Sequence, residues 1–215
     1  LSPRSDTSLW RLELPWAGGK IGDLIAIGDL DGGGCPEVML QMWLRGVPYW
    51  MQCLLRGEDG SMLWSRSASS PHEAPGPLHL HLAGDVNGDG TPDLWAIGKT
   101  DFVWHDLVAI QSGLDGSMIR SAQRSCGVSG SSECPDLDGD GVNDLVVLSP
   151  VDRATRQYVV EVVSSRTLEP LVEFHCEDAL SVAAMRTPHG VRIVVSSGPG
   201  LQAFDLVSKE GVGER

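Results

Sequence analysis

The chain has 215 residues, of which 41% are hydrophobic and 21% charged, and its formal net charge is −13. This composition is typical of a globular domain and excludes a disordered chain. Phosphate binding requires clustered Lys and Arg, so the acidic balance argues against nucleic acid as a partner. No apolar run approaches the roughly 18 residues that span a bilayer, so we expect no direct membrane insertion of this segment.

Short apolar segments bounded by Gly, Pro, Asp and Ser recur along the chain, which is the pattern of strands and turns. No helical period persists over three turns. Hairpin turns are expected at Asp59-Gly60 and Asp115-Gly116. In chain order, strands are predicted at residues 8–14, 23–28, 37–44, 48–55, 61–67, 78–84, 93–98, 105–112, 117–122, 131–134, 144–150, 158–165, 171–176, 179–185, 192–197 and 201–206.

These strands form units of about 50 residues with four strands each, the size of one propeller blade. The tetrad DGSM occurs in the same place in the first two units, at residues 59–62 and 115–118. The sequence therefore predicts an all-β fold, a β-propeller of four-stranded blades with about four blades in this chain. The blades are predicted at residues 21–67, 78–123, 128–176 and 179–211, within a single propeller domain or propeller fragment spanning 1–215.

The last unit is one strand short, and residues 7–14 form a strand with no unit before it. Such a strand can complete the last blade and remove exposed sheet edges. Two alternatives remain open at this point. The chain is a complete small ring closed by its N-terminal strand, or it is part of a larger propeller. Because it begins at Leu1 without a signal-peptide pattern, we expect a processed chain or an excised piece.

Three acidic loops follow the first strand of the first three units. Each has oxygen-bearing side chains at alternate positions and a carboxylate at position 9, with Gly at position 6. The two full copies contain Asp85, Asn87, Asp89 and Asp93, and Asp136, Asp138, Asp140 and Asp144. The weaker copy keeps Asp29, Asp31 and Glu37, but Gly33 replaces the ligand at position 5.

Hard divalent cations such as Ca²⁺ take six to eight oxygen ligands, and such loops supply them from side chains and from a backbone carbonyl. The carbonyl at position 7 is that of Thr91 or Val142. A simple hydrophilic turn is the alternative, but the recurrence with a strand after each loop favours metal binding. Position 12 falls at Ala96 or Val147 within a strand, which excludes an EF-hand. We therefore predict two Ca²⁺ sites and a third, degenerate one.

The segments DVNGDGTPDL and DLDGDGVNDL resemble the calcium loops of FG-GAP (VCBS-type) repeats, found in integrin alpha-subunit propellers and in bacterial secreted or cell-surface proteins. The resemblance implies calcium coordination by the eight residues of the two full copies. It also implies an extracellular or cell-surface location and a binding, adhesion or protein-interaction module without catalysis of its own. Its ligand would be an unidentified protein or glycan. The Phe-Gly and Gly-Ala-Pro signatures of integrins are not evident, so no integrin-like specificity is implied.

The competing hypothesis is a propeller domain of a secreted carbohydrate-active enzyme, a lyase or hydrolase, with calcium-assisted glycan binding. Two histidine patterns bear on catalysis. His79 and His81 lie on one side of a predicted strand, but no third zinc ligand is placed by spacing. His105-Asp106 resembles part of a triad, but no serine stands in a nucleophile elbow. The seven Trp favour packing between blades over stacking on sugars.

The five cysteines follow no zinc spacing. Cys126 and Cys134 flank a Gly/Ser-rich stretch, where a local disulfide is one alternative and free thiols are the other. Cys35, Cys53 and Cys176 lie in or beside predicted strands, where we expect buried thiols.

Overall fold

The computed structural model describes residues 10–13, 20–43, 50–67, 79–99, 106–124, 127–152, 154–198 and 200–206. Within these ranges the protein is all-β, with no helix and four separate antiparallel sheets. No helix of the described residues is long and apolar enough to cross a membrane. The all-β prediction is confirmed.

The four sheets follow one another in the sequence, and consecutive strands are neighbours in each. The first sheet contains β1 (Lys20–Gly28), β2 (Glu37–Trp43), β3 (Trp50–Leu55) and β4 (Met62–Ser67). The second contains β5 (His79–Gly84), β6 (Asp93–Lys99), β7 (Asp106–Gln111) and β8 (Met118–Arg124). The third contains β9 (Gly130–Cys134), β10 (Asp144–Asp152), β11 (Gln157–Val163) and β12 (Pro170–Glu177). The fourth contains β13 (Ala179–Thr187), β14 (Gly190–Ser197) and β15 (Gly200–Leu206).

Hairpin turns connect the third and fourth strands of the first three sheets. Asp59 accepts the Ser61 N–H at 2.8 Å, and Asp115 accepts the Ser117 N–H at 2.8 Å, as expected of turn residues. In the third sheet Leu168 takes the place of glycine, with a φ of 62°. The hairpin turns predicted at Asp59-Gly60 and Asp115-Gly116 are therefore confirmed, and the third sheet has a turn at the same place.

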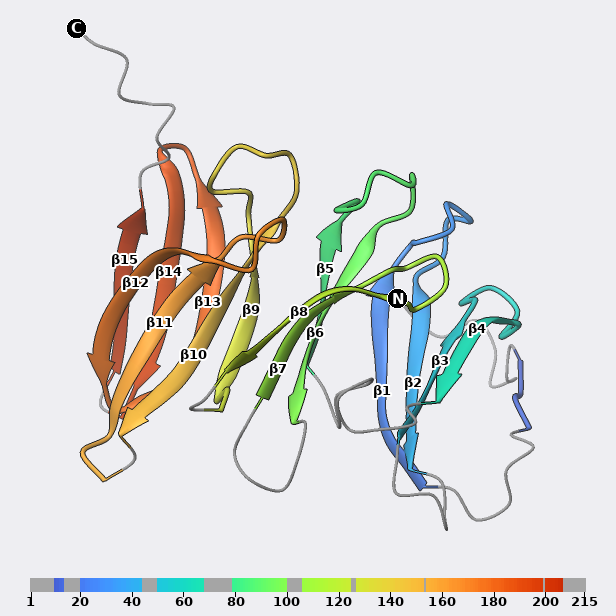
Figure 1. The fold of residues 1–215 in the computed structure, drawn as a ribbon, viewed down its shortest axis with the longest axis horizontal. Coiled ribbons are helices and arrows are strands. Elements are labelled where there is room, and N and C mark those ends of the chain that lie inside the picture. The colour runs from blue at the N-terminus through green and yellow to red at the C-terminus, as the bar shows by residue number, and fades with distance from the viewer. Residues whose placement is uncertain are drawn as a thin grey trace, which may run out of the picture.

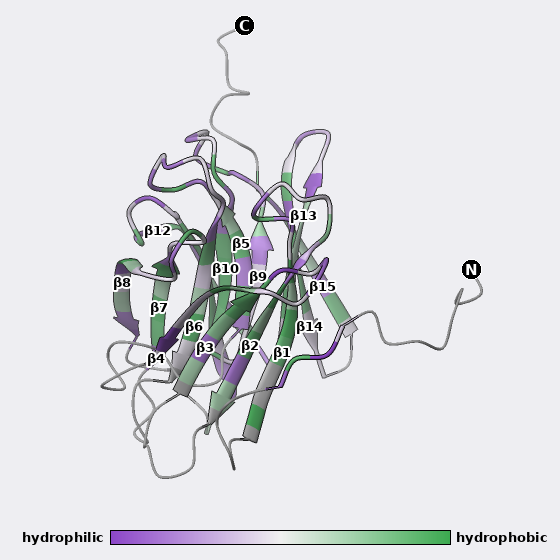
Figure 2. Ribbon diagram, turned by 90° about the vertical axis from the view of Figure 1, so that its right-hand side faces the viewer, coloured by the Kyte–Doolittle hydropathy of each residue, from purple (hydrophilic) through white to green (hydrophobic). Residues whose placement is uncertain are grey.

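The sheets pack face to face in a row, and Figure 1 shows the first and fourth sheets at opposite ends of it. Successive sheets touch through their first strands, β1 with β5, β5 with β9 and β9 with β13. Separate buried apolar clusters fill the three spaces between neighbouring sheets. In Figure 2 hydrophobic colour is concentrated in the strands, while the loops above them are largely hydrophilic. The described strands form an open row, so a closed propeller stays a prediction.

The N-terminal segment is described only at residues 10–13, and its role as the last strand of the closing blade stays a prediction. Residues 10–13, the described part of 7–14, have no strand pairing. Trp10 and Leu12 instead pack on the apolar face of the first sheet, against the cluster that includes Leu40 and Met51. The Trp10 indole N–H donates to the Gly57 carbonyl at 3.0 Å. This segment therefore covers the first sheet in the way that each later sheet is covered by the sheet before it.

The described tryptophans support the prediction that these side chains pack between sheets. Trp64 is 8% exposed and its indole N–H donates to the Gly113 carbonyl of the second sheet. Trp95 is fully buried in the cluster between the second and third sheets. Trp16 and Trp104 lie outside the described residues, as do the side chains of Trp43 and Trp50.

Candidate metal-binding loops

Three loops of the same design join the first and second strands of the first three sheets. They cover residues 29–36 (loop 1), 85–92 (loop 2) and 135–143 (loop 3). Glycines at positions 4 and 6 of each loop have positive φ values, such as 79° for Gly88 and 89° for Gly90. Residues with a side chain rarely adopt this left-handed backbone conformation, which explains why glycine occupies both positions. In loops 1 and 3 the tight curl brings the carboxylates at positions 1 and 3 close together.

The carboxylate at position 1 closes each loop by accepting backbone N–H groups. Asp85 accepts the Gly88 N–H at 2.7 Å and the Gly90 N–H at 2.9 Å. Asp136 makes the equivalent bonds to Gly139 at 2.8 Å and Gly141 at 2.9 Å. In loop 1 Asp29 keeps one of them, to Gly34 at 3.0 Å. The loops are therefore preformed by their own acidic side chains.

The carboxylate at position 9 is fully buried in all three loops, and Glu37, Asp93 and Asp144 are each 0% exposed. Each accepts the N–H of the residue at position 2, which is Leu30, Val86 and Leu137 respectively. This side chain therefore links the start of the second strand back to the start of the loop.

The second oxygen at position 9 distinguishes the loops. Asp93 Oδ1 accepts the Gly113 N–H at 3.3 Å, and Asp144 Oδ1 accepts the Ser165 N–H at 3.4 Å, both from hairpin turns of the same sheet. Glu37 Oε1 is buried and has no hydrogen-bond partner. An unpaired buried carboxylate oxygen is costly, so this atom favours a cation at loop 1.

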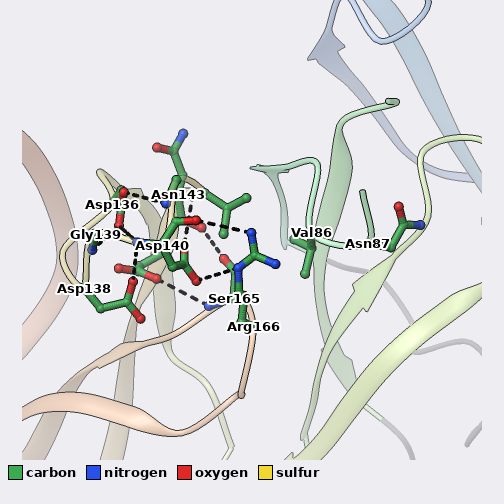
Figure 3. A network of polar contacts seen from close by, with 12 residues as sticks. Val86, Asn87, Asp136, Asp138, Gly139, Asp140, Asn143, Ser165 and Arg166 are labelled. Atoms are coloured by element: carbon green, nitrogen blue, oxygen red, sulfur yellow. Dashed lines mark hydrogen bonds and ion pairs between the residues drawn. The ribbon is translucent and has the colours of Figure 1, made fainter. Parts of the chain in front are cut away.

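Two of the loops bring three carboxylates close enough to share one ion. The ligand atoms of Asp29, Asp31 and Glu37 all lie within 4.8 Å of one another. Those of Asp136, Asp138 and Asp144 do the same in loop 3. Figure 3 shows Asp136 and Asp138 side by side in this loop. Both acidic clusters could hold a metal ion. Loop 1, which the sequence marks as degenerate, therefore gathers its three acidic side chains despite Gly33.

Loop 2 forms no such group of three acidic side chains among the described residues. Its position 3 is Asn87, whose Nδ2 donates to Asp89 Oδ2 at 2.8 Å while its Oδ1 accepts the Asp89 N–H at 2.8 Å. Thr91 and Val142, at position 7, donate their N–H groups to Asp89 and Asp140. Metal coordination by their carbonyl oxygens stays a prediction, as does metal binding by loop 2.

Burial raises the pKa of several carboxyl groups in loops 2 and 3. Burial raises the pKa of Asp144 to about 7, and the neighbouring charges of Asp138 and Asp140 add to the effect. Burial also raises the pKa of Asp93 and that of Asp140 above the ordinary value. A buried carboxylate is destabilised when it is charged and unpaired, so a bound cation would offset this cost.

Arginines contact loops 1 and 3, and the sequence reasoning missed them. Arg56 Nε lies 2.7 Å from Asp31 Oδ2, and Arg166 Nε lies 3.2 Å from Asp140 Oδ2. Both arginines come from the hairpin turn between the third and fourth strands of the sheet that carries the loop. Arg56 lies four residues before the turn glycine Gly60, and Arg166 lies two residues before Leu168, which takes the place of that glycine.

The histidine patterns gain no further metal ligands among the described residues. His81 Nε2 lies 2.9 Å from Ser131 Oγ across the interface of the second and third sheets. Burial lowers the pKa of His81 to about 4, with a further contribution from His79. Asp106 accepts the Val128 N–H, while His105 lies outside the described residues.

The cysteines are free thiols where they are described. Cys53, Cys134 and Cys176 are buried and Cys35 is half-buried. The predicted buried thiols are confirmed at Cys53 and Cys176. Cys126, the other half of the candidate disulfide, lies outside the described residues.

No protein-family model matches the chain, and no curated protein matches it. The resemblance to FG-GAP repeats therefore rests on the loop motifs themselves.

Proposed function

We propose that this chain is a calcium-stabilised β-propeller, or part of one, that acts as a binding, adhesion or protein-interaction module. In this proposal the protein works outside the cell or at its surface and has no catalysis of its own. Its four successive antiparallel sheets, with their first strands in contact, support an arrangement of blades around one axis.

The observation that carries the calcium proposal is the grouping of three carboxylates at loops 1 and 3. Calcium–oxygen distances are about 2.3–2.6 Å, so two ligands of one ion lie at most about 5 Å apart. The oxygens of each group lie within 4.8 Å of one another and meet this limit. An all-oxygen ligand set is the preference of Ca²⁺ rather than Zn²⁺, which favours nitrogen and sulfur.

The position of the loops supports a structural role for the ion. Each loop joins two strands, and the buried carboxylate of loops 2 and 3 also holds a hairpin turn of the same sheet. An ion bound there fixes one corner of the sheet. Recognition of an unidentified protein or glycan would then use other loops of the propeller, because loops on a rigid scaffold are the usual carriers of binding.

The fourth sheet bears on the extent of the propeller. It has three strands among the described residues, and Leu180 and Leu201 are 68% and 76% exposed. Large apolar side chains on an open sheet are typical of a surface covered by another element. In the proposed propeller, a neighbouring blade covers them. That blade is the first sheet of the same chain in a four-bladed ring, or an additional blade in a larger one.

Thermal unfolding with and without calcium tests this proposal. A ligand that binds only the folded state stabilises it by RT ln(1 + [L]/Kd), about 2.7 kcal/mol per site at a hundredfold excess over Kd. We expect the melting temperature to rise with Ca²⁺ and to fall with EGTA, and magnesium at equal concentration to have a smaller effect. An unchanged melting temperature in EGTA would remove the structural-metal role.

A further inference from the structure

Loop 3 contains four acidic side chains, but only three of them lie together. Asp140, at position 5, is absent from the group formed by Asp136, Asp138 and Asp144. Its side chain instead faces Arg166 of the β11–β12 turn (Figure 3). The side chain expected to be the third ligand is thus paired with a cation supplied by the protein itself.

The contact between Asp140 and Arg166 leaves one carboxylate oxygen incompletely satisfied. Asp140 Oδ1 accepts the Val142 N–H at 2.9 Å. Oδ2 lies 3.2 Å from Arg166 Nε, yet it is buried and makes no hydrogen bond. The arginine also donates through Nη2 to the Asp140 backbone carbonyl at 3.2 Å. The ion pair with Arg166 is therefore the one polar contact of Oδ2 in the described structure.

The other two loops differ from loop 3 in this respect. In loop 1 Arg56 pairs with Asp31, but Asp31 remains within its acidic group. In loop 2 Ser112 and Leu114 occupy the turn positions that correspond to Arg56 and Arg166. Loop 3 alone among the described loops combines an arginine with an acidic side chain outside its acidic group.

We propose that Arg166 competes with the cation for Asp140, so that it sets the cation affinity of loop 3. This inference rests on the proposed metal binding of that loop. Without a cation, the guanidinium offsets the charge of Asp140 and keeps it apart from the other three carboxylates. When the cation binds, Oδ2 leaves Arg166 and completes the ligand set, and the guanidinium of the turn is released. Among the residues that the structure describes, loop 2 has no arginine in this position.

Replacement of Arg166 by Gln tests the competition. Calcium is titrated into the full ¹⁵N-labelled chain and followed by NMR. The chemical shift of the Gly141 amide measures binding at loop 3, and that of the Gly90 amide measures binding at loop 2. We expect Arg166→Gln to tighten calcium binding at loop 3 by about two- to fivefold, the range for a partly exposed ion pair, and to leave loop 2 unchanged. We also expect a lower melting temperature in EGTA, because the metal-free loop loses its counterion.

Two further variants distinguish competition by Arg166 from a general effect of the protein's net charge on calcium binding. Arg156→Gln removes an exposed arginine of the same sheet that pairs with Asp178 at 3.2 Å, and it should leave the affinity of loop 3 unchanged. Arg166→Lys keeps the charge but loses the planar fork, and it should give an intermediate affinity. It also serves as the test if the Gln variant does not fold.

The outcomes distinguish this inference from the proposed function. If the NMR signal of the Gly141 amide in the unmodified protein does not shift with calcium, the proposed metal binding at loop 3 is wrong. The proposed competition is then wrong as well. If the unmodified protein binds calcium but Arg166→Gln binds no more tightly, the competition alone is wrong. An equal gain in Arg156→Gln would likewise overturn it, because net charge would then explain the effect.

Discussion

Trp64 donates its indole N–H to the carbonyl oxygen of Gly113, 2.8 Å away in the next sheet. The N–H of the same glycine donates to Asp93 Oδ1 at 3.3 Å. Gly113 therefore links an inter-sheet contact to the buried carboxylate of loop 2. Trp10 makes the equivalent bond to Gly57, and Arg120 donates to the Arg166 carbonyl at the next interface. In each of these three contacts the acceptor is a backbone carbonyl in the turn between the third and fourth strands of a sheet.

We expect Trp64→Phe to lower the free energy of unfolding by about 1–2 kcal/mol, because it leaves the buried Gly113 carbonyl without its donor while most of the ring area remains. Urea unfolding measures the change. Leu114→Ala, an exposed position in the same turn, is the control and should have little effect. Equal stability of the Trp64→Phe variant would show that the hydrogen bond contributes nothing.

We expect Gly113→Ala to be strongly destabilising. A Cβ at this position would lie 2.0 Å from the Pro92 carbonyl oxygen, and backbone must move to accommodate it. Overpacking of this kind costs about 1–3 kcal/mol. Gly200→Ala is the matched control, since nothing lies within 4 Å of its Cβ. Denaturant midpoints that fall equally for the two variants would contradict the steric argument.

We expect Glu37→Gln to reduce the stabilisation by calcium while leaving the metal-free protein at least as stable. The substitution removes a buried charge close to Asp29 and Asp31 but keeps an acceptor for the Leu30 N–H. Melting temperatures in EGTA and in calcium measure both effects. Glu58→Gln, an exposed acid of the β3–β4 turn, controls for net charge. A full calcium response in Glu37→Gln would exclude Glu37 as a ligand.

We expect His81 to contribute a loss of stability as the pH falls from about 6.5 toward 4, against the opposite contribution of Asp144, whose pKa burial raises to about 7. Burial lowers the pKa of His81 to about 4 in the folded state, whereas the unfolded chain has the ordinary value of 6.5. Between these values the unfolded state binds a proton that the folded state does not, so unfolding is favoured. Urea unfolding at pH 7 and pH 5 measures this.

When the pH is lowered from 7 to 5, the free energy of unfolding should fall less, or rise more, in His81→Asn than in the unmodified protein. His189→Asn, an exposed imidazole in the β13–β14 turn, should leave it unchanged. If His81→Asn and the unmodified protein lose the same free energy between the two pH values, His81 does not contribute to the acid sensitivity.

The sequence predicted most of the strands because their signals are local. Alternation of apolar residues and the Asp-Gly turns place β3, β4, β7 and β8 within a few residues of their observed bounds. The acidic positions of the loops were predicted for the same reason, since the spacing from Asp136 to Asp144 is a property of one short segment. The three strands that the structure describes in the fourth sheet were also predicted from the repeat.

Contacts between distant residues could not be predicted in this way. The pairing of Arg166 with Asp140 spans 26 residues, and the bond from Trp64 to Gly113 spans 49. The place of residues 10–13 on the first sheet depends on which apolar face is left uncovered. Similarly, the grouping of Asp29, Asp31 and Glu37 depends on the reach of the longer Glu37 side chain from its buried position.

The sequence by itself thus determined the all-β class, the repeating unit and the acidic loops, because strand periodicity and turn chemistry operate over a few neighbouring residues. Only the tertiary structure decided which acidic side chains come together and which are paired with arginine. Those outcomes depend on the approach of the hairpin turns to the loops and on the burial of the carboxylate at position 9, and both arise when the strands of each sheet pair and the sheets pack together.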